Sequence, residues 1–527
     1  MGRRKSERKN IIRSGWFRLP LVIIIAVLPV LLASKLFPTG EVGTHASLEE
    51  FIAHLDIRIP AIMEDYKIPG LAIALIQDGE PVWRQAYGYA DLGAGRKMTT
   101  DSYYRTESIS KSVTAWGVMK LVEKNLIDLD VPVQKYIDTW EIPETEFAEE
   151  GVTVRRLLSG SSGMPLGTIG EYYSPTAEDI PSLKDILSKD AVLFREPGSA
   201  FFYSNTGFNI LELLIEEVTG RDFAVYMKEE ILGPLGMEEA GFEWSENFDP
   251  PVAKGYGMRG EAIPVYVYPD KAAGGLFATL DGVARFASAG MTNFTNRHRD
   301  VLDPGTIEEM YSPYTSMSGY YTFVFDGYGL GHFIEYLPVE NNGSEGRDTA
   351  GFTRVVSHGG QGTGWMTDFH FIPERGDGIV ILSNSQRTWP GFGYILSDWA
   401  NWLGFTSIGM GAIVLVQKWV WVTIALGLFA LLWQSMRLLD GFVLGTRRFA
   451  PWAKEDRLLR SLQGCFAVVC AALFLWIMSL DYWFIDSVLP IAGGWLNYID
   501  LYAAFVLAAS ALFPSLKKAK AKKEEQV

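Results

Sequence analysis

The segment Tyr103-Tyr-Arg-Thr-Glu-Ser108-Ile-Ser-Lys111-Ser-Val-Thr-Ala-Trp116 places a serine and a lysine three residues apart. Apolar residues recur after it at helical spacing, which predicts a helix with Ser108 at its N-terminus. Residues at i and i+3 share a helix face, so the amine lies beside the hydroxyl. A serine becomes a nucleophile when a base takes its proton, and burial can lower a lysine pKa from ~10.4 to allow this. Ser108 is therefore the predicted nucleophile and Lys111 its base. The competing interpretation is an N-cap serine followed by a solvated lysine.

Two further polar motifs occur later in the chain. Tyr203-Ser-Asn205 lies between a Pro-Gly turn and an amphipathic segment, which suits a loop that presents a phenol and an amide. The run Ser357-His358-Gly359-Gly360-Gln361-Gly362 precedes two predicted strands joined by a turn at Glu374-Arg-Gly-Asp-Gly378. Glycines in a strand mark close approach of backbone or ligand. The competing interpretations are a core aromatic for Tyr203 and a strand-end histidine satisfied by backbone for His358.

Taken in this order, Ser-x-x-Lys, Tyr-x-Asn and His-Gly-Gly resemble the three motifs of the penicillin-recognising serine hydrolases of peptidase S12 type. This family includes class C β-lactamases, D-Ala-D-Ala carboxypeptidases, D-aminopeptidases and esterases. The resemblance extends from about Leu48 to Asn401 and includes four other stretches: Pro69-Gly-Leu-Ala-Ile-Ala-Leu-Ile-Gln-Asp-Gly-Glu, Leu157-Leu-Ser-Gly-Ser-Ser-Gly163-Met-Pro165, Gly233-Pro-Leu-Gly-Met237 and Ala273-Gly-Gly-Leu276. It implies an α+β fold of the β-lactamase/transpeptidase type, with an antiparallel sheet flanked by helices, an all-helical part and, in this chain, added transmembrane helices.

The resemblance also implies roles for individual residues. Ser108, Lys111 and Tyr203 are the expected catalytic residues, with the tyrosine relaying a proton to the leaving group and helping to activate the deacylating water. The expected substrate and oxyanion residues are Asn205, His358, Gly360 and Gln361. Asn205 would hold Lys111 or bind the substrate amide. The backbone N–H groups of Ser108 and Gln361 would meet the oxyanion.

The third motif departs from the β-lactamase pattern. Those enzymes carry Lys-Thr-Gly, whose cation and hydroxyl bind a substrate carboxylate. Here His358-Gly359-Gly360 offers an imidazole that is mostly neutral at pH 7 and no hydroxyl. The motif therefore does not predict strong recognition of a β-lactam or D-Ala-D-Ala carboxylate. His-x-Gly versions belong to D-aminopeptidases, esterases and peptidases of the family.

Apolar runs near both ends of the chain predict membrane spans, because each approaches the ~20 residues that cross a bilayer. The predicted organisation is a cytoplasmic basic segment (1–18), an N-terminal signal anchor or signal peptide (19–36), a linker (37–47), an extracytoplasmic serine hydrolase domain (48–403), a first C-terminal transmembrane helix with its lead-in (404–436), a cytoplasmic loop (437–460), a second transmembrane helix (461–480), an external loop (481–494), a third transmembrane helix (495–516) and a cytoplasmic basic tail (517–527). No clear Ala-x-Ala site follows the first run, which favours a retained anchor.

Charge placement orients these spans. Lys and Arg fill 437–460 and the tail, whereas Asp481 to Gly494 contains neither. By the positive-inside rule the C-terminus is cytoplasmic and the hydrolase domain faces outward from a bacterial cell membrane, toward the outside or periplasm. A signal peptide would give the same external domain.

Composition excludes several classes of function. The formal net charge of −15 makes nucleic acid an unexpected partner. Cys465 and Cys470 are the two cysteines of the chain and both fall in one predicted span, so the external domain forms no disulfide. The six scattered histidines form no His-x-x-x-His pair, and neither a metal site nor a cofactor is expected.

The sequence thus predicts a membrane-anchored serine hydrolase that forms an acyl-enzyme on a small amide, ester or D-amino-acid-containing peptide. The runner-up is a membrane peptidase that removes an acyl-D-amino-acid leader from a secreted natural product, although Gly362-Thr-Gly364 lacks the asparagine expected there. A penicillin-binding carboxypeptidase or esterase and a catalytically silent cell-wall module also fit the motifs, and a transporter is less favoured. The predicted partners are substrate and lipid bilayer, and the spans either shape access to the site or mediate a homodimer.

Overall fold

The computed structural model describes residues 19–32, 42–338, 351–480 and 484–515. The chain divides into two compact units, Gly40–Ala412 on the one hand and Met1–Thr39 with Ile413–Val527 on the other. The predicted basic segment 1–18, the tail 517–527 and parts of the predicted anchor and linker lie outside the described residues. We call Gly40–Ala412 the catalytic unit and the other the helical membrane unit.

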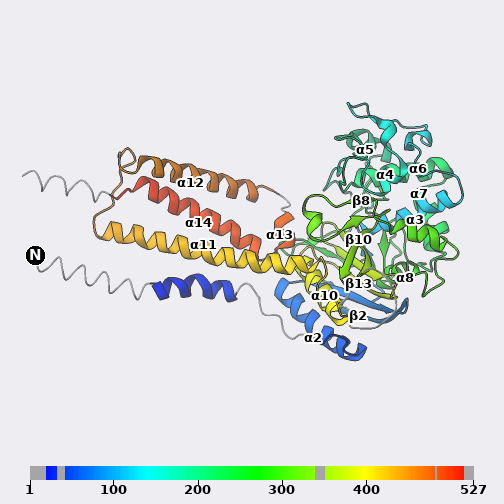
Figure 1. Cartoon of the computed structure of the whole chain (residues 1–527), viewed down its shortest axis with the longest axis horizontal. Coiled ribbons are helices and arrows are strands. Elements are labelled where there is room, and N and C mark those ends of the chain that lie inside the picture. The colour runs from blue at the N-terminus through cyan, green and yellow to red at the C-terminus, as the bar shows by residue number, and fades with distance from the viewer. Residues whose placement is uncertain (1–18, 33–41, 339–350, 481–483, 516–527) are drawn as a thin grey trace, which may run out of the picture. The chain divides into compact units, whose positions relative to one another are not determined.

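A nine-stranded antiparallel sheet forms the centre of the catalytic unit, in the order β3-β2-β1-β13-β12-β11-β10-β9-β8 (Figure 1). Its strands are β1 (Gly70–Gln77), β2 (Glu80–Asp91), β3 (Arg96–Lys97), β8 (Thr315–Ser316), β9 (Gly327–Tyr328), β10 (Phe333–Pro338), β11 (Phe352–Gln361), β12 (Met366–Ile372) and β13 (Asp377–Ser383). Two short pairs lie outside it, β4 (Tyr104–Arg105) with β7 (Phe277–Ala278) and β5 (Gly255–Tyr256) with β6 (Ala262–Ile263).

The apolar run in β1 explains its central place in the sheet. Nearly every residue of this strand is buried, which is typical of a strand covered on both faces. Asp78 and Gly79 both have positive φ, as a two-residue hairpin turn requires, and they connect β1 to β2. The hairpin pairs Leu71 with Tyr87, and β1 pairs Leu71 with Ser383 on its other side.

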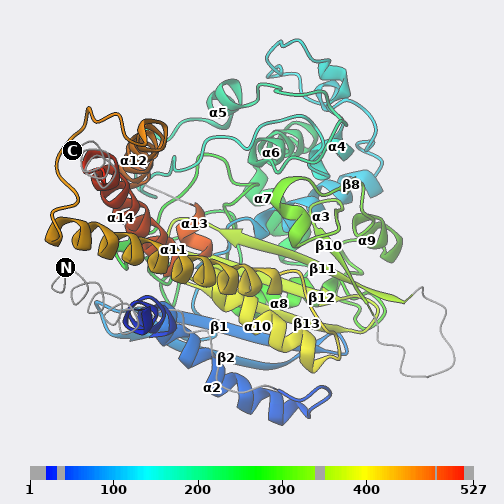
Figure 2. The same cartoon turned by 60° about the vertical axis from the view of Figure 1, so that its left-hand side comes forward.

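Nine α-helices are described in the catalytic unit: α2 (Leu48–Tyr66), α3 (Ile109–Glu123), α4 (Val154–Leu158), α5 (Leu183–Asp190), α6 (Asn205–Thr219), α7 (Phe223–Met227), α8 (Leu280–Ala289), α9 (Pro304–Met310) and α10 (Trp389–Trp402). The shorter turns are η1 (Val133–Lys135), η2 (Glu149–Gly151), η3 (Lys228–Leu232) and η4 (Gly319–Phe323). Figure 2 shows α4 to α7 grouped beside α3, away from β1 and β2.

Strand alternation divides these helices between the two faces of the sheet. Ala72, Ala74 and Ile76 belong to one core cluster with α3, α6 and α8. Helices α2 and α10 pack against each other, with the ring centroids of Tyr66 and Tyr394 6.4 Å apart. This α+β arrangement, with an all-helical part beside α3, confirms the predicted fold class.

The helical membrane unit contains three helices that are long and apolar enough to cross a bilayer. They are α11 (Gly411–Val443), α12 (Arg457–Met478) and α14 (Ala492–Leu512), and the short helix α13 (Phe484–Val488) precedes the last. The apolar helix Leu19–Leu32 is shorter than these. Helix α11 runs on through Arg437 to Val443, into the stretch predicted as a loop, and no glycine or proline lies between Gly427 and Gly441.

Polar side chains tie the membrane helices together. Ser435 and Tyr502 are hydrogen-bonded at 2.7 Å, and Gln434 donates to Ser510 at 2.9 Å. Arg460 donates to the carbonyl of Ala511 at 2.8 Å, where the last carbonyls of a helix lack intrahelical partners. Such interhelical bonds hold spans together where water cannot compete.

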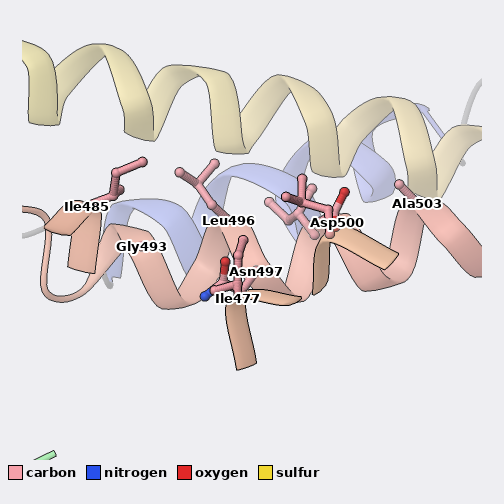
Figure 3. A pocket seen from close by; sticks show the side chains of 9 residues that line it. Ile477, Ile485, Gly493, Leu496, Asn497, Asp500 and Ala503 are labelled. Carbon is pink, nitrogen blue, oxygen red and sulfur yellow. The ribbon is translucent and has the colours of Figure 1, made fainter. Parts of the chain in front are cut away.

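A cavity of about 360 Å³ lies among α12, α13 and α14. Figure 3 shows Asn497 and Asp500 among the apolar side chains that line it. Asp500 lies in the first half of α14. The Cys470 thiol hydrogen-bonds this carboxylate. The cavity lies within the helical membrane unit and contributes nothing to the motifs of the catalytic unit.

We expect Gly88→Ala to destabilise the β1–β2 hairpin. Gly88 has φ +75°, and an added Cβ would lie 2.1 Å from the carbonyl oxygen of Pro69. Left-handed strain and overpacking together predict a loss of about 2–5 kcal/mol in the free energy of unfolding. Denaturant unfolding of the detergent-purified protein measures it.

Gly95→Ala is the matched control, since Gly95 has φ +66° but nothing within 4 Å of an added Cβ. Its free energy of unfolding should fall only by the cost of left-handed backbone strain, about 1–2 kcal/mol. Equal losses in the two variants would show that the close approach at Gly88 does not constrain the hairpin.

Candidate active site

Ser108 immediately precedes α3, and its side chain does not cap that helix. Instead, Lys111 Nζ donates a hydrogen bond to Ser108 Oγ at 3.1 Å. Ser108 is partly exposed, whereas Glu107 and Ile109 on either side of it are buried. The hydroxyl at this N-cap position is thus partly exposed and held by an amine in place of the helix backbone, an arrangement that suits a nucleophile beside its base.

The Lys111 amine is buried and held at a second point by the backbone. Its Nζ donates to the carbonyl of Ala273 at 2.8 Å. Burial lowers the pKa of Lys111 to about 7, and the charges of Asp270 and Glu107 oppose this shift. A lysine with this pKa is about half neutral at pH 7, so it can accept a proton from Ser108.

The phenol of Tyr203 approaches the same hydroxyl. It hydrogen-bonds Ser108, and Lys111 Nζ lies 4.9 Å from the centre of its ring. Burial raises the pKa of Tyr203 above its usual value, so the phenol keeps its proton near pH 7. A protonated phenol beside the nucleophile is placed to deliver a proton to a departing group.

Asn205 is the first residue of α6, and its backbone N–H donates to Leu166 at 3.0 Å. The neighbouring Ser204 caps this helix by accepting from Gly207 at 2.9 Å. In the described part of the chain, Lys111 is held by Ser108 and the Ala273 carbonyl and not by Asn205. The predicted hydrogen bond from Asn205 to a substrate amide stays a prediction.

A buried carboxyl on α6 fixes the backbone segment that carries Ala273. Glu212 Oε2 accepts from the N–H of Lys271 at 2.6 Å and of Ala272 at 2.7 Å. Burial raises the pKa of Glu212 to about 8. The sequence did not predict this residue, although a glutamate inside the apolar run Ile210-Leu-Glu-Leu-Leu-Ile215 is a usable signal.

The third motif lies on β11, where His358 is buried. Its Nδ1 donates to the carbonyl of Gly359 at 2.8 Å, and its Nε2 accepts from the Tyr328 hydroxyl at 3.2 Å. Burial, with the nearby charge of Lys111, holds the pKa of His358 well below its usual value. The imidazole is therefore neutral and engaged on both nitrogens, and it does not supply the cation of the Lys-Thr-Gly motif.

The glycine at 360 allows β11 to approach the segment that carries the nucleophile. A Cβ at Gly360 would lie 2.1 Å from the Thr106 carbonyl oxygen. Thr367 on β12 donates to that same oxygen at 2.6 Å. Gln361 follows at the end of β11, where its side chain accepts from Trp389 Nε1 at 3.0 Å. The predicted oxyanion role of the Ser108 and Gln361 N–H groups stays a prediction.

Glu107, directly before the nucleophile, forms a buried network that the sequence analysis did not find. Its backbone has φ +51°, a strained conformation for a residue with a side chain. The carboxylate accepts from Arg105 Nε at 2.9 Å, Tyr266 at 3.1 Å and Tyr268 at 2.9 Å. A Cβ at Gly362 would lie 2.2 Å from this carboxyl group. Glu107 thus joins the nucleophile segment to the end of β11.

The described residues contain no group of three or more His, Cys, Asp or Glu side chains that could hold a metal ion. The predicted site residues come from four places: α3 contributes Lys111, the segment before it Ser108, the segment that leads into α6 and its first residue contribute Tyr203 and Asn205, and β11 contributes the glycine-rich motif.

The Beta-lactamase family model matches residues 55–395, which is more than half of the chain. The chain therefore belongs to this family. Its motifs and the site geometry define a serine hydrolase-like member whose relatives include penicillin-binding proteins, an esterase and a hydrolase.

Two curated relatives and one solved structure illustrate the similarity. Penicillin-binding protein 4* of Bacillus subtilis is 24% identical over 353 residues, covering 63% of this chain and 72% of that protein. Esterase EstB of Burkholderia gladioli is 30% identical over 225 residues, covering 41% and 56%. The octameric penicillin-binding protein homologue from Pyrococcus abyssi superposes with a TM-score of 0.55 at 28% identity, covering 68% of this chain and 78% of that one.

We expect Glu107→Gln to shift the pH dependence of acylation to lower pH. The Lys111 amine works as a base only when neutral, so acylation should rise through pH 7. The Glu107 charge favours the ammonium form, and its removal should lower the pKa of Lys111 further. The rate of acylation between pH 5 and 9 measures this shift.

Tyr268→Phe is the matched control, because it removes one hydrogen bond to Glu107 and no charge. The pH at which its acylation rate rises should be the same as in the unsubstituted protein. Glu107→Gln also leaves Arg105 without its buried partner, and this predicts a stability loss of about 3–5 kcal/mol. If Glu107→Gln lowers stability but leaves the pH dependence of acylation unchanged, the role of Glu107 is purely structural.

Proposed function

We propose that this protein is a membrane-anchored serine hydrolase that acts outside the cell and forms an acyl-enzyme on an amide or ester. The observation that carries the proposal is the hydrogen bond between Lys111 and Ser108, made by a buried amine whose pKa is about 7. The competing interpretation, a capping serine followed by a solvated lysine, does not account for a hydrogen bond between these two side chains.

The reaction follows from the three side chains. Lys111 takes the proton of Ser108 as Oγ attacks the substrate carbonyl, and the oxyanion is met by backbone N–H groups. Tyr203 then donates its proton to the leaving amine or alcohol and regains one from Lys111. Water attacks the acyl-enzyme by the reverse proton path, which frees Ser108. A catalytically silent module would not need to keep Ser108, Lys111 and Tyr203, and this chain has all three.

The substrate we propose is a D-amino-acid-containing peptide, amide or ester that needs no carboxylate for recognition. A carboxylate at the third motif would meet the neutral imidazole of His358 in place of a lysine cation. Burying an unpaired charge there would be costly. This disfavours strong binding of penicillins and of C-terminal D-Ala-D-Ala.

Ser108→Ala and Lys111→Ala test the chemistry. We expect Ser108→Ala to form no acyl-enzyme on a panel of acyl-D-amino-acid esters and amides, and Lys111→Ala to acylate about 10²–10⁴-fold more slowly. Intact mass and product release from the detergent-purified protein measure both. Lys120→Ala, on the same helix, is the control and should behave as wild type. Retained turnover in both site variants would overturn the mechanism.

The proposed topology has its own test. Protease added to intact cells should degrade the catalytic unit and spare an epitope fused after Val527, because the basic stretches 437–460 and 517–527 favour the cytoplasmic side. Inside-out vesicles serve as the control and should give the opposite pattern. A protected catalytic unit in intact cells would place it in the cytoplasm.

A further inference from the structure

A row of stacked aromatic rings leads away from the catalytic tyrosine. Tyr203 stacks on Tyr321 with ring centroids 5.9 Å apart, and Tyr321 stacks on Tyr320 at 4.3 Å. Phe333 lies parallel to Tyr203, with 3° between the ring planes and 6.2 Å between the centroids. We call Tyr203, Tyr320, Tyr321 and Phe333 the aromatic wall.

The wall passes from the protein interior to solvent. Phe333 on β10 is 4% exposed, whereas Tyr320 at the start of η4 is 57% exposed. A single exposed tyrosine needs no explanation. Here, however, the exposed ring continues a stack that ends on the phenol bonded to the nucleophile. The stack therefore connects an exposed ring, through Tyr321, to the tyrosine that the proposed mechanism places at the leaving group.

The loop that carries Tyr320 and Tyr321 is fixed to the surrounding structure. Ser318 donates to the Phe201 carbonyl at 2.7 Å, and Thr315 donates to the Ser159 carbonyl at 3.0 Å. Phe325, just after η4, stacks on Phe333 with centroids 4.1 Å apart. A wall that is already ordered loses little entropy when a ligand packs on it.

The wall carries no cation for a charged ligand. Among the described cations, Lys111 alone lies over one of its rings, and the proposed mechanism uses that amine as the base. His358, whose ring lies 5.0 Å from that of Phe333, is neutral. Burial raises the pKa of Tyr321 well above its usual value, so this phenol stays uncharged. An uncharged ring is the ligand that such a surface favours.

We propose that the aromatic wall is a subsite for an uncharged aromatic group on the leaving-group side of the scissile bond. This inference rests on the proposed function, because the donation of a proton by Tyr203 defines which side of the substrate leaves. Tyr320 is the specificity-determining residue of the subsite, since its ring is the exposed end of the stack.

The experiment measures equilibrium binding in the Ser108→Ala background, where hydrolysis does not interfere. The probes are N-acetyl-D-alanyl amides of phenethylamine, cyclohexylethylamine, methylamine and β-alanine, titrated by calorimetry into the full-length protein in detergent. We expect the phenethylamide to bind more tightly than the other three. Tyr320→Ala should weaken phenethylamide binding by about 3–10-fold and leave methylamide binding unchanged.

Two further variants separate the subsite from general effects. Tyr320→Phe keeps the ring and should keep the preference. Tyr336→Ala removes a tyrosine that is 38% exposed on β10 and that belongs to no ring pair of the wall, so it should change nothing. Tighter binding of the β-alanine amide than of the phenethylamide would overturn the subsite. Equal phenethylamide affinities with and without the Tyr320→Ala substitution would do the same.

Turnover of the same amides by the unsubstituted protein, which has both Ser108 and Tyr320, tests the proposed function separately. Ser108-dependent cleavage supports it. The expected binding preference without any Ser108-dependent cleavage would overturn the hydrolase and leave the aromatic subsite standing. Ser108-dependent cleavage without a preference for the phenethylamide would support the hydrolase and overturn the aromatic subsite.

Discussion

The loss of water around one amine is the constraint on which the site depends. Lys111 can act as a base only because burial makes its ammonium form costly, and the protein replaces water with the Ser108 hydroxyl and the Ala273 carbonyl. The carboxylates of Asp270 and Glu107 oppose this effect. Their balance brings the pKa of Lys111 to about 7, where the amine can both take and return a proton.

Much of the surrounding structure keeps this amine in position. Glu212 holds the backbone segment that presents the Ala273 carbonyl. Glu107, hydrogen-bonded to Tyr266 and Tyr268 and close to Gly362, joins the nucleophile segment to the end of β11. Gly360 and Gly362 leave room for these approaches, since a Cβ at either position would meet neighbouring atoms closer than 2.5 Å. The active site is thus assembled from tight contacts between elements distant in the sequence.

The parts of the site that the sequence predicted are those with local signals. The three-residue spacing of Ser108 and Lys111 places both on one helix face, and the turn at 374–378 between two strand-like segments marks a paired β12 and β13. Glu212 and Ala272 are hydrogen-bonded across a separation of 60 residues, which leaves no periodic trace in the sequence. The positive φ of Glu107 is equally silent, because the groups around its carboxylate, Tyr266, Tyr268 and Gly362, come from segments distant in the sequence. In the helical membrane unit, α11 extends beyond residue 436, where the predicted apolar span ends, because the residues that follow still favour a helix.

The most direct test of the central claim is the pKa of Lys111 itself. The protein labelled with ¹³C at the lysine ε-carbon would be titrated by NMR, with the Lys111→Arg spectrum used to assign the resonance. A Lys111 signal that titrates near pH 7 is the predicted result, set by the burial of its amine. A signal that titrates near ~10.4, as for a solvated lysine, would contradict a neutral base beside Ser108.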